Sequence, residues 1–150
     1  MPERPRLAGD IGPPHYVLDI GVPGRLTRTG SDVTTTVTGP CGTVELTVTL
    51  RARPPAEDAT GVLLVVVAGV IDMCTAPVLE AALSDAVDRH TTVRCDLADV
   101  RVLSAAGVTT LIKAYQRATR TGSRLTVCGA HGLTLRVLQV TGVDQVLREP

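Results

Sequence analysis

The side chains of this chain that could take part in chemistry lie in two short polar turns, one containing Asp72 and the other Ser104. A serine hydroxyl becomes a nucleophile when a base lies within hydrogen-bond reach and a third group orients that base. His131 and Asp96 could fill these roles, but nothing in their spacing requires them to meet Ser104. Ser104 also lacks the Gly-x-Ser-x-Gly context of a hydrolase. We therefore predict that the protein is not an enzyme.

Metal and cofactor sites are not expected either. The cysteines Cys41, Cys74, Cys95 and Cys128 form no Cys-x-x-Cys pair, the spacing that structural zinc sites favour. We interpret them as free thiols that behave as small buried hydrophobes. The stretch at residues 129–132 lacks the Gly-x-Gly-x-x-Gly or Gly-Lys-Ser/Thr content of a phosphate-binding loop.

The composition excludes several classes of partner. The formal net charge is zero, so nothing favours electrostatic capture of nucleic acid or of an anionic membrane surface. The N-terminal residues lack the apolar core of a signal peptide, and the longest apolar run, Val62–Ile71, is about half a membrane span. These features predict a cytoplasmic protein that binds neither nucleic acid nor membranes directly.

The turn at Ser104 is expected to join a strand to an amphipathic helix. Residues 93–97 read as a short strand, and residues 100–103 lead from it to Ser104, whose hydroxyl can cap a helix amide. The helix begins near Ala105 and ends at Gly122. The side chains expected on its buried face are Val108, Leu111, Ile112 and Tyr115.

The turn at Asp72 is expected to have the same setting. Residues 62–67 form a continuously apolar strand, which predicts a position at the centre of a sheet with both faces covered. Pro77, just after Thr75, marks the start of a helix. The first interpretation of Asp72 is a carboxylate that caps the first turn of that helix. The apolar stripe of the helix consists of Leu79, Leu83, Ala86 and Val87.

Strands and helices alternate from residue 61 onward. Because consecutive parallel strands are joined by helical crossovers, this order predicts an α/β fold: a mixed, mostly parallel central sheet of four to five strands covered by three to four helices. The strand at residues 43–50 is expected to be antiparallel, at or near an edge. Partners of such sheets meet the loops at the carboxyl ends of the strands, so Asp72 and Ser104 are expected at the same end.

The first 42 residues differ from the rest of the chain. Residues 1–40 hold six of the ten prolines, so we predict a flexible or partly paired N-terminal arm at residues 1–42. Residues 33–38 and 43–50 both alternate apolar side chains with Thr, and the two could pair as a hairpin. Residues 16–20 could also dock on the domain.

Three runs of sequence resemble the STAS domain of bacterial anti-sigma factor antagonists. DLADVRVLSAAGVTTLI, residues 96–112, has the family's strand, Asp-Leu, small-residue turn ending in Gly, and helix. GVLLVVVAGVIDMCTAPVLEAAL, residues 61–83, is similar to its strand, Gly-x-x-Asp turn and first helix. SRLTVCGAHGLTLRVLQVTGVDQVL, residues 123–147, is similar to its last strand and Leu-x-x-Thr-Gly-hydrophobic helix end. The resemblance implies a STAS-like domain at residues 43–150.

The resemblance also implies a departure at the site of regulation. Members of the family that switch by phosphorylation carry Asp-Ser-Ser/Thr-Gly, with the phosphoacceptor immediately before the Gly. Aligning on Gly107 puts Ala106 at that position, and alanine has no hydroxyl. Ser104 is the only hydroxyl left in the turn, so it is the one candidate for phosphorylation there, although its first interpretation is a helix cap.

The partner implied by the resemblance is an anti-sigma factor of the histidine-kinase-like ATPase type, whose capture frees a sigma factor. The protein itself is expected to be a monomer or a weak homodimer. The alternative is a STAS module that binds a small molecule, or that serves as a scaffold subunit of a sensory assembly without a sigma-linked partner. The expected partner-binding face consists of Asp72, Met73, Ser104, Ala105, Ala106, Gly107 and Thr109.

Overall fold

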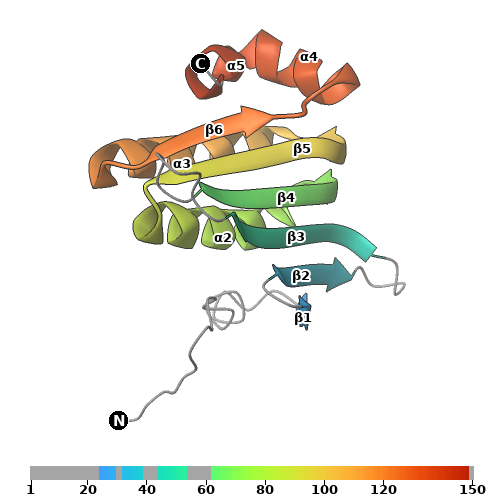
Figure 1. Cartoon of the computed structure of the whole chain (residues 1–150). Helices are drawn as coiled ribbons and strands as arrows, with labels where there is room; N and C mark the ends of the chain where they lie inside the picture. Colours follow the sequence, from blue (N-terminus) through green and yellow to red (C-terminus); the bar gives the residue numbers. More distant parts are fainter. Residues whose placement is uncertain (1–23, 30–31, 39–43, 54–61, 149–150) are drawn as a thin grey trace.

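The computed structural model describes residues 24–29, 32–38, 44–53 and 62–148, and Figure 1 shows a sheet with helices packed against it. The strands are β1 (Gly24–Thr29), β2 (Asp32–Thr38), β3 (Val44–Arg53), β4 (Val62–Ile71), β5 (Thr92–Leu103) and β6 (Arg124–Cys128). The helices are α2 (Ala76–Arg89), α3 (Ala105–Thr121), α4 (Gly132–Thr141) and α5 (Val143–Leu147).

The strands lie in the sheet in the order in which they occur in the chain. Strands β1 to β4 are antiparallel neighbours, whereas β4, β5 and β6 are parallel. The predicted mixed α/β class is confirmed, with its parallel part from β4 onward, but in the described sheet three strand pairings are antiparallel and two are parallel, so the sheet is less parallel than predicted. Among the described residues the sheet has six strands rather than the four to five predicted, because β1 and β2 extend it. For the same reason β3 lies in the interior of the sheet and not at or near an edge as expected.

The pairing between residues 33–38 and 43–50 that the sequence left open is present. Val33 lies opposite Leu50, and Val37 opposite Leu46. Strands β1 and β2 both belong to the segment expected to be a flexible or partly paired arm. Residues 1–23, including the segment at 16–20 that was considered for docking, lie outside the described residues.

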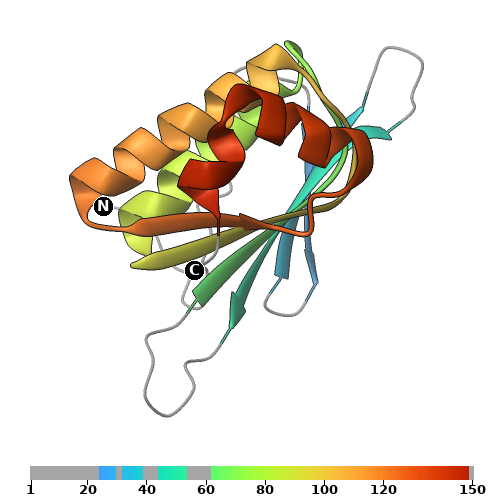
Figure 2. The same cartoon turned by 90° about the horizontal axis from the view of Figure 1, so that it is seen from above.

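Helices α2 and α3 cover one face of the sheet (Figure 2). Along β4, Val65 and Val67 are buried beneath these helices, whereas Val66 on the opposite face is half-buried. Val66 lies opposite Thr49 of β3, whose hydroxyl is 2.9 Å from that of Thr34. The prediction that both faces of this strand are covered is therefore wrong. A run composed almost entirely of Val and Leu carries no alternation from which one covered face could be recognised.

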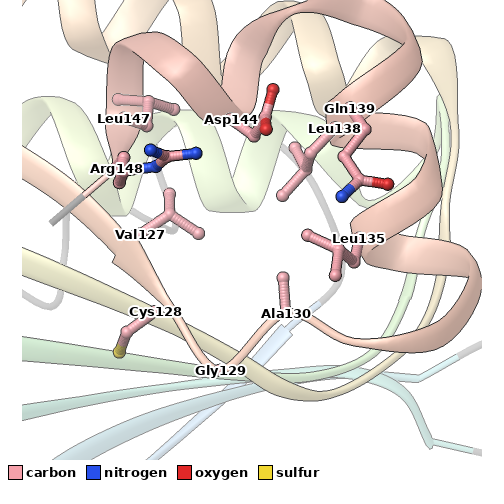
Figure 3. A pocket seen from close by; sticks show the side chains of 10 residues that line it. All are labelled: Val127, Cys128, Gly129, Ala130, Leu135, Leu138, Gln139, Asp144, Leu147 and Arg148. Atoms are coloured by element: carbon pink, nitrogen blue, oxygen red, sulfur yellow. The ribbon is translucent and has the colours of Figure 1, made fainter.

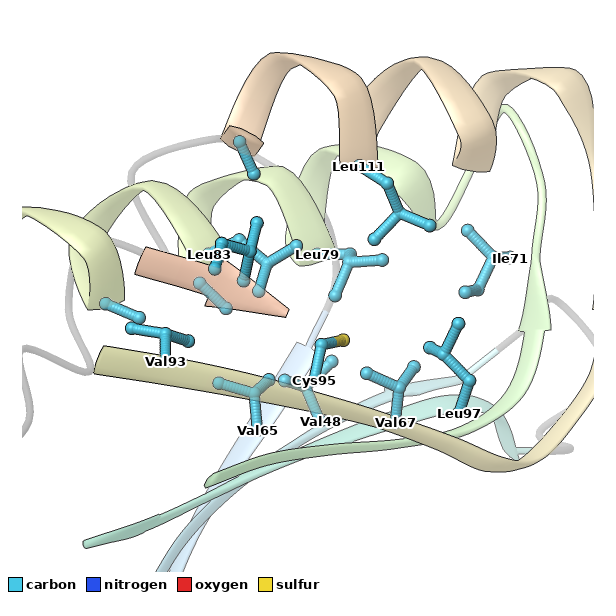
Figure 4. Packing of buried hydrophobic residues seen from close by; sticks show 14 of the residues in the cluster. Val48, Val65, Val67, Ile71, Leu79, Leu83, Val93, Cys95, Leu97 and Leu111 are labelled. Carbon is cyan, nitrogen blue, oxygen red and sulfur yellow. The ribbon is translucent and has the colours of Figure 1, made fainter. Parts of the chain in front are cut away.

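The core lies between this face and the helices, and aliphatic side chains fill it (Figure 4). The chain has no Phe and no Trp, so close packing depends on branched side chains of similar size. Burial raises the pKa of the Cys95 thiol far above its usual value, and Cys95 packs as a small hydrophobe, as predicted. The labelled core residues are Val48, Val65, Val67, Ile71, Leu79, Leu83, Val93, Cys95, Leu97 and Leu111.

Helix α3 is rotated about its axis from the predicted orientation. Val108 and Leu111 are buried as predicted, but Ile112 is exposed and Tyr115 is half-buried. The small residues Gly107, Ala114 and Ala118 share the buried face. The prediction followed the largest apolar side chains, whereas the buried face of α3 also uses small ones, which let the helix approach its neighbours closely.

An ion pair joins the outer surfaces of α2 and α3. Arg117 Nε and Nη2 donate to the two carboxylate oxygens of Asp88, at 2.8 and 2.6 Å. This hydrogen bonding holds the pKa of Asp88 below its usual value. The contribution of the pair to stability is therefore present above the pKa of the unfolded carboxyl group and is lost as the pH falls through the folded value.

Helices α4 and α5 pack beside the β5–β6 side of the sheet (Figures 1 and 2). The buried hydroxyl of Thr134, in the first turn of α4, donates to the carbonyl oxygen of Val100 at 3.2 Å. This bond fixes the start of α4 against the end of β5. No helix of the described residues is both long enough and apolar enough to cross a membrane.

Gly69 provides a test of the antiparallel register. Its φ is +109°, and a Cβ atom there would collide with the backbone carbonyl group of Glu45 on β3. We expect Gly69→Ala to lower the free energy of unfolding by about 2 kcal/mol or more. Gly122→Ala is the matched control, because φ there is +80° and the added Cβ would meet open space, so its cost is about 1 kcal/mol. Equal losses in urea denaturation would contradict the close approach of β3 to Gly69.

Candidate functional site

The two polar turns meet at the carboxyl ends of β4 and β5, as predicted. Ile71, the last residue of β4, lies opposite Leu103, the last residue of β5. One residue further, the Ser104 N–H donates to the carbonyl oxygen of Ile71 at 3.0 Å. The turn at Asp72 and the turn at Ser104 are therefore held side by side by the backbone itself.

Ser104 caps helix α3, which confirms its first interpretation. Its backbone is extended, and its Oγ accepts a hydrogen bond from the Gly107 N–H at 3.3 Å. Its carbonyl oxygen accepts the first bond of the helix, from Val108, at 3.0 Å. A cap of this kind stabilises a helix by about 1 kcal/mol. The hydroxyl therefore has a structural role in the protein as it stands.

Gly107 is buried rather than part of the outer surface. A Cβ atom at this position would lie 2.6 Å from Leu103 Cδ1 and 2.7 Å from Ile71 Cγ2. The absence of a side chain lets the first turn of α3 rest directly on the ends of β4 and β5. Gly107 therefore sets the position of the turn, while Ala105 is exposed and Ala106 half-buried.

Asp72 organises the turn before α2 rather than the first turn of the helix. Its Oδ1 accepts hydrogen bonds from the backbone N–H groups of Cys74, at 2.9 Å, and Thr75, at 3.0 Å. Both amides precede the first helical residue, Ala76. The prediction that the Asp72 carboxylate caps the first turn of the helix is therefore wrong, because it closes the turn that precedes the helix. The side chain of Met73 is left 79% exposed at the tip of this turn.

Thr75 is a site residue that sequence reasoning missed. Although its side chain is polar, Thr75 is fully buried. Its hydroxyl donates to the Val70 carbonyl oxygen at 2.8 Å and accepts from the Asp72 N–H at 2.9 Å. Thr75 therefore ties the turn to the last residues of β4. The signal was available in the Thr-x-Pro order at the helix start, which marks Thr75 as the residue before the first turn.

Exposed apolar side chains surround these turns. In addition to Met73, Leu133 at the start of α4 is 78% exposed and Val102 near the end of β5 is 49% exposed. Val102 lies opposite Val70, two residues before Asp72 in the sequence. Thr109, the outermost of the predicted contact residues on α3, is also exposed. Exposed apolar side chains gathered near one end of a sheet are typical of a surface that binds another protein.

The groups that could have served catalysis are engaged elsewhere. Asp96 Oδ1 accepts the Ala98 N–H at 2.9 Å, and His131 Nε2 lies 2.8 Å from the Ala98 carbonyl oxygen. The first bond lies within β5, and the second holds the loop between β6 and α4 against β5. The described hydrogen bonds of Ser104 are all with backbone groups. Within the described ranges, no three His, Cys, Asp or Glu side chains are placed to hold a metal ion. Cys74 is exposed, contrary to the expectation of a buried thiol.

The fold and this site together define a small α/β module whose exposed turns suit protein binding. The sequence model of the family described as "Mlab, STAS domain" matches residues 55–149. The chain therefore belongs to the STAS domain family. No curated protein sequence matches the chain.

The solved structures that are similar to this one include two anti-sigma factor antagonists. An anti-sigma factor antagonist from Mycobacterium paratuberculosis is 27% identical, with a TM-score of 0.57, and the alignment covers 75% of this chain and 88% of the other. The anti-sigma factor antagonist SpoIIAA in its unphosphorylated form is 13% identical, with a TM-score of 0.52 and coverage of 64% and 83%. The similarity to the Mycobacterium paratuberculosis protein includes the amino-acid sequence, whereas the similarity to SpoIIAA concerns the fold alone.

The contribution of the buried Thr75 hydroxyl to stability can be tested by removing it. Thr75→Val keeps the shape of the side chain but leaves the Val70 carbonyl and the Asp72 N–H without their partner, so we expect the free energy of unfolding to fall by about 2 to 3 kcal/mol. The exposed Thr109 provides the control, because Thr109→Val should change stability by less than about 0.5 kcal/mol. Urea denaturation of both variants checks this expectation. If the two losses match, Thr75 does not tie the turn to β4.

Proposed function

We propose that this protein is an anti-sigma factor antagonist that binds an anti-sigma factor of the histidine-kinase-like ATPase type and thereby frees a sigma factor. The observation that carries the proposal is the exposed pair of turns at Met73 and Ser104, joined at the carboxyl ends of β4 and β5. The similarity to an antagonist at 27% identity supports the same reading. The protein acts by binding and not by catalysis.

The partner contacts would centre on Met73 and on the first turn of α3. Met73 offers a long, exposed apolar side chain, which suits insertion into a pocket of the partner. Ala105 and Ala106 are small, so a partner backbone can approach the helix closely. Asp72 and Ser104 hold these residues in place through their hydrogen bonds, and Thr109 lies at the margin of the contact.

The binding surface would lack the usual phosphate switch. Ala106 occupies the phosphoacceptor position of the family, and the hydroxyl of Ser104 already caps α3. A phosphate facing an acidic group of a partner roughly 6 Å away would be repelled by about 3 kcal/mol per charge pair at an effective dielectric constant of 20. Without an acceptor hydroxyl this repulsion cannot be introduced at residue 106, and the antagonist stays competent to bind.

We place the protein in the cytoplasm, where sigma factors act, as a monomer or weak homodimer. The zero formal net charge supports a role through protein contact without direct binding of nucleic acid or membranes. The described residues carry no arrangement suited to holding a metal, and the proposed role requires no cofactor.

The proposed surface can be tested by placing a charge on it. We expect the chain to bind at least one histidine-kinase-like ATPase of its source genome in isothermal titration calorimetry, and Met73→Glu to weaken that binding about thirtyfold or more, the loss of one central contact. Val140→Glu is the matched control, since Val140 is 76% exposed at the far end of α4, and it should leave the affinity unchanged. Failure to bind any of these ATPases would refute the proposed partner.

The absence of a phosphoacceptor hydroxyl at Ala106 leads to a separate prediction. When the unaltered chain is incubated with the partner ATPase and ATP, its affinity should stay constant and mass spectrometry should find no phosphate in the peptide containing Ser104. Ala106→Ser should restore an acceptor and produce a phosphorylated form with about a hundredfold lower affinity, the equivalent of the repulsion above. A phosphopeptide containing Ser104 in the unaltered chain, together with lost affinity, would contradict the proposal.

A second candidate function has one observation in its favour, a cavity beside β6. In this alternative the chain is a STAS module that binds a small molecule, or a scaffold subunit of a sensory assembly. Copurification from the native cell separates the two: an anti-sigma ATPase supports the first function, and homologous scaffold subunits support the second.

A further inference from the structure

A cavity of about 220 Å³ lies between β6 and the helices α4 and α5, away from the turns at Met73 and Ser104 (Figure 3). This volume corresponds to about seven water molecules at about 30 Å³ each. The pocket is open to solvent on one side, and both apolar and polar side chains line it.

The inner wall of the cavity is apolar. Leu138 and Leu147 form part of the buried core, and Val127 and Leu135 are half-buried beside them. These four side chains come from β6, α4 and α5, so the space is bounded by three elements of the fold. An aliphatic group placed here would leave water and contact several methyl groups at once.

The rim of the cavity carries one charge of each sign. Asp144 and Arg148 both line it, and Figure 3 shows them near each other at the α5 side. They are four residues apart, a spacing at which opposite charges usually pair. Among the described residues, neither side chain forms a hydrogen bond or an ion pair. The side-chain amide of Gln139 is likewise without a described partner and completes the polar rim.

These features select the charge of a ligand. An anion would gain from Arg148 but would be repelled by Asp144, and a cation would meet the reverse. A molecule with both an ammonium and a carboxylate group can satisfy both side chains, and its aliphatic part can fill the space over Leu138 and Leu147. We propose that this cavity binds a small zwitterion with an aliphatic side chain, an amino acid of the size of L-leucine.

The proposed geometry assigns a role to each group. Arg148 donates hydrogen bonds to the carboxylate, and Asp144 accepts from the ammonium group, with Gln139 available to either. The aliphatic side chain packs on the leucines. A glycine molecule would make the polar contacts but leave the apolar wall uncovered, so binding requires both parts.

The test uses the full chain, with chemical shifts of its amides and isothermal titration calorimetry as the two measurements. L-leucine should shift the amide signals of β6, α4 and α5. It should also bind at least about tenfold more tightly than three compounds that each lack one of its groups: glycine lacks the aliphatic side chain, 4-methylpentanoate lacks the ammonium group, and isopentylamine lacks the carboxylate. Absence of shifts at millimolar L-leucine would overturn the proposal. Equal binding of 4-methylpentanoate or isopentylamine would also overturn it, because one charge would then be unnecessary.

Substitutions test the charged rim and the space of the cavity separately. Arg148→Gln and Asp144→Asn should each weaken L-leucine binding about tenfold or more, whereas Arg136→Gln, an exposed position on α4 outside the cavity, should leave it unchanged. Ala130→Leu should abolish binding by filling the cavity while the circular dichroism spectrum stays the same. Unchanged affinity in both rim variants would refute the assignment, and far-ultraviolet spectra confirm that each variant is folded.

Discussion

The contact between the first turn of α3 and the ends of β4 and β5 is the constraint on which the site depends. Gly107 rests on Ile71 without a side chain between them, and the Ser104 N–H bonds to the carbonyl oxygen of the same residue. Together they fix where α3 begins relative to β4. The outer residues of both turns then have a defined separation without any direct bond between their side chains. A binding surface made of short turns can be rigid for this reason.

The same contact explains how a site with so few polar groups is held in shape. Three polar side chains near it bond to the backbone: Asp72 in the turn before α2, Thr75 at the end of β4, and Ser104 on α3. What remains for a partner is mostly apolar and small. Such a surface offers shape and hydrophobic area rather than charge, which is the usual character of the centre of a protein interface.

Much of this arrangement could be predicted from the sequence, because its signals are local. The cap at Ser104, the end of α3 at Gly122 and the meeting of the two turns follow from residue types at fixed spacing and from the rule for parallel strands. The uncovered face of β4 and the rotation of α3 could not be predicted, since both depend on which surfaces meet in space. Ile112 is larger and more apolar than Ala114, yet Ala114 is buried and Ile112 is exposed. The Thr-x-Pro order marked Thr75 as the residue before α2, but its burial and its bond to the Val70 carbonyl oxygen depend on how the turn folds back on the end of β4.

The antiparallel half of the sheet determines where the chain can be truncated without loss of its core. The family match begins at residue 55, after β3, whereas Leu46 and Val48 of β3 are completely or almost completely buried. A fragment cut at that boundary would lose two core side chains worth about 1.5 to 3 kcal/mol each. It would also turn β4, ten residues of almost unbroken Val and Leu, into an open edge strand. Edges of that kind recruit other chains, and the pairing of β3 with β4 keeps β4 inside the sheet.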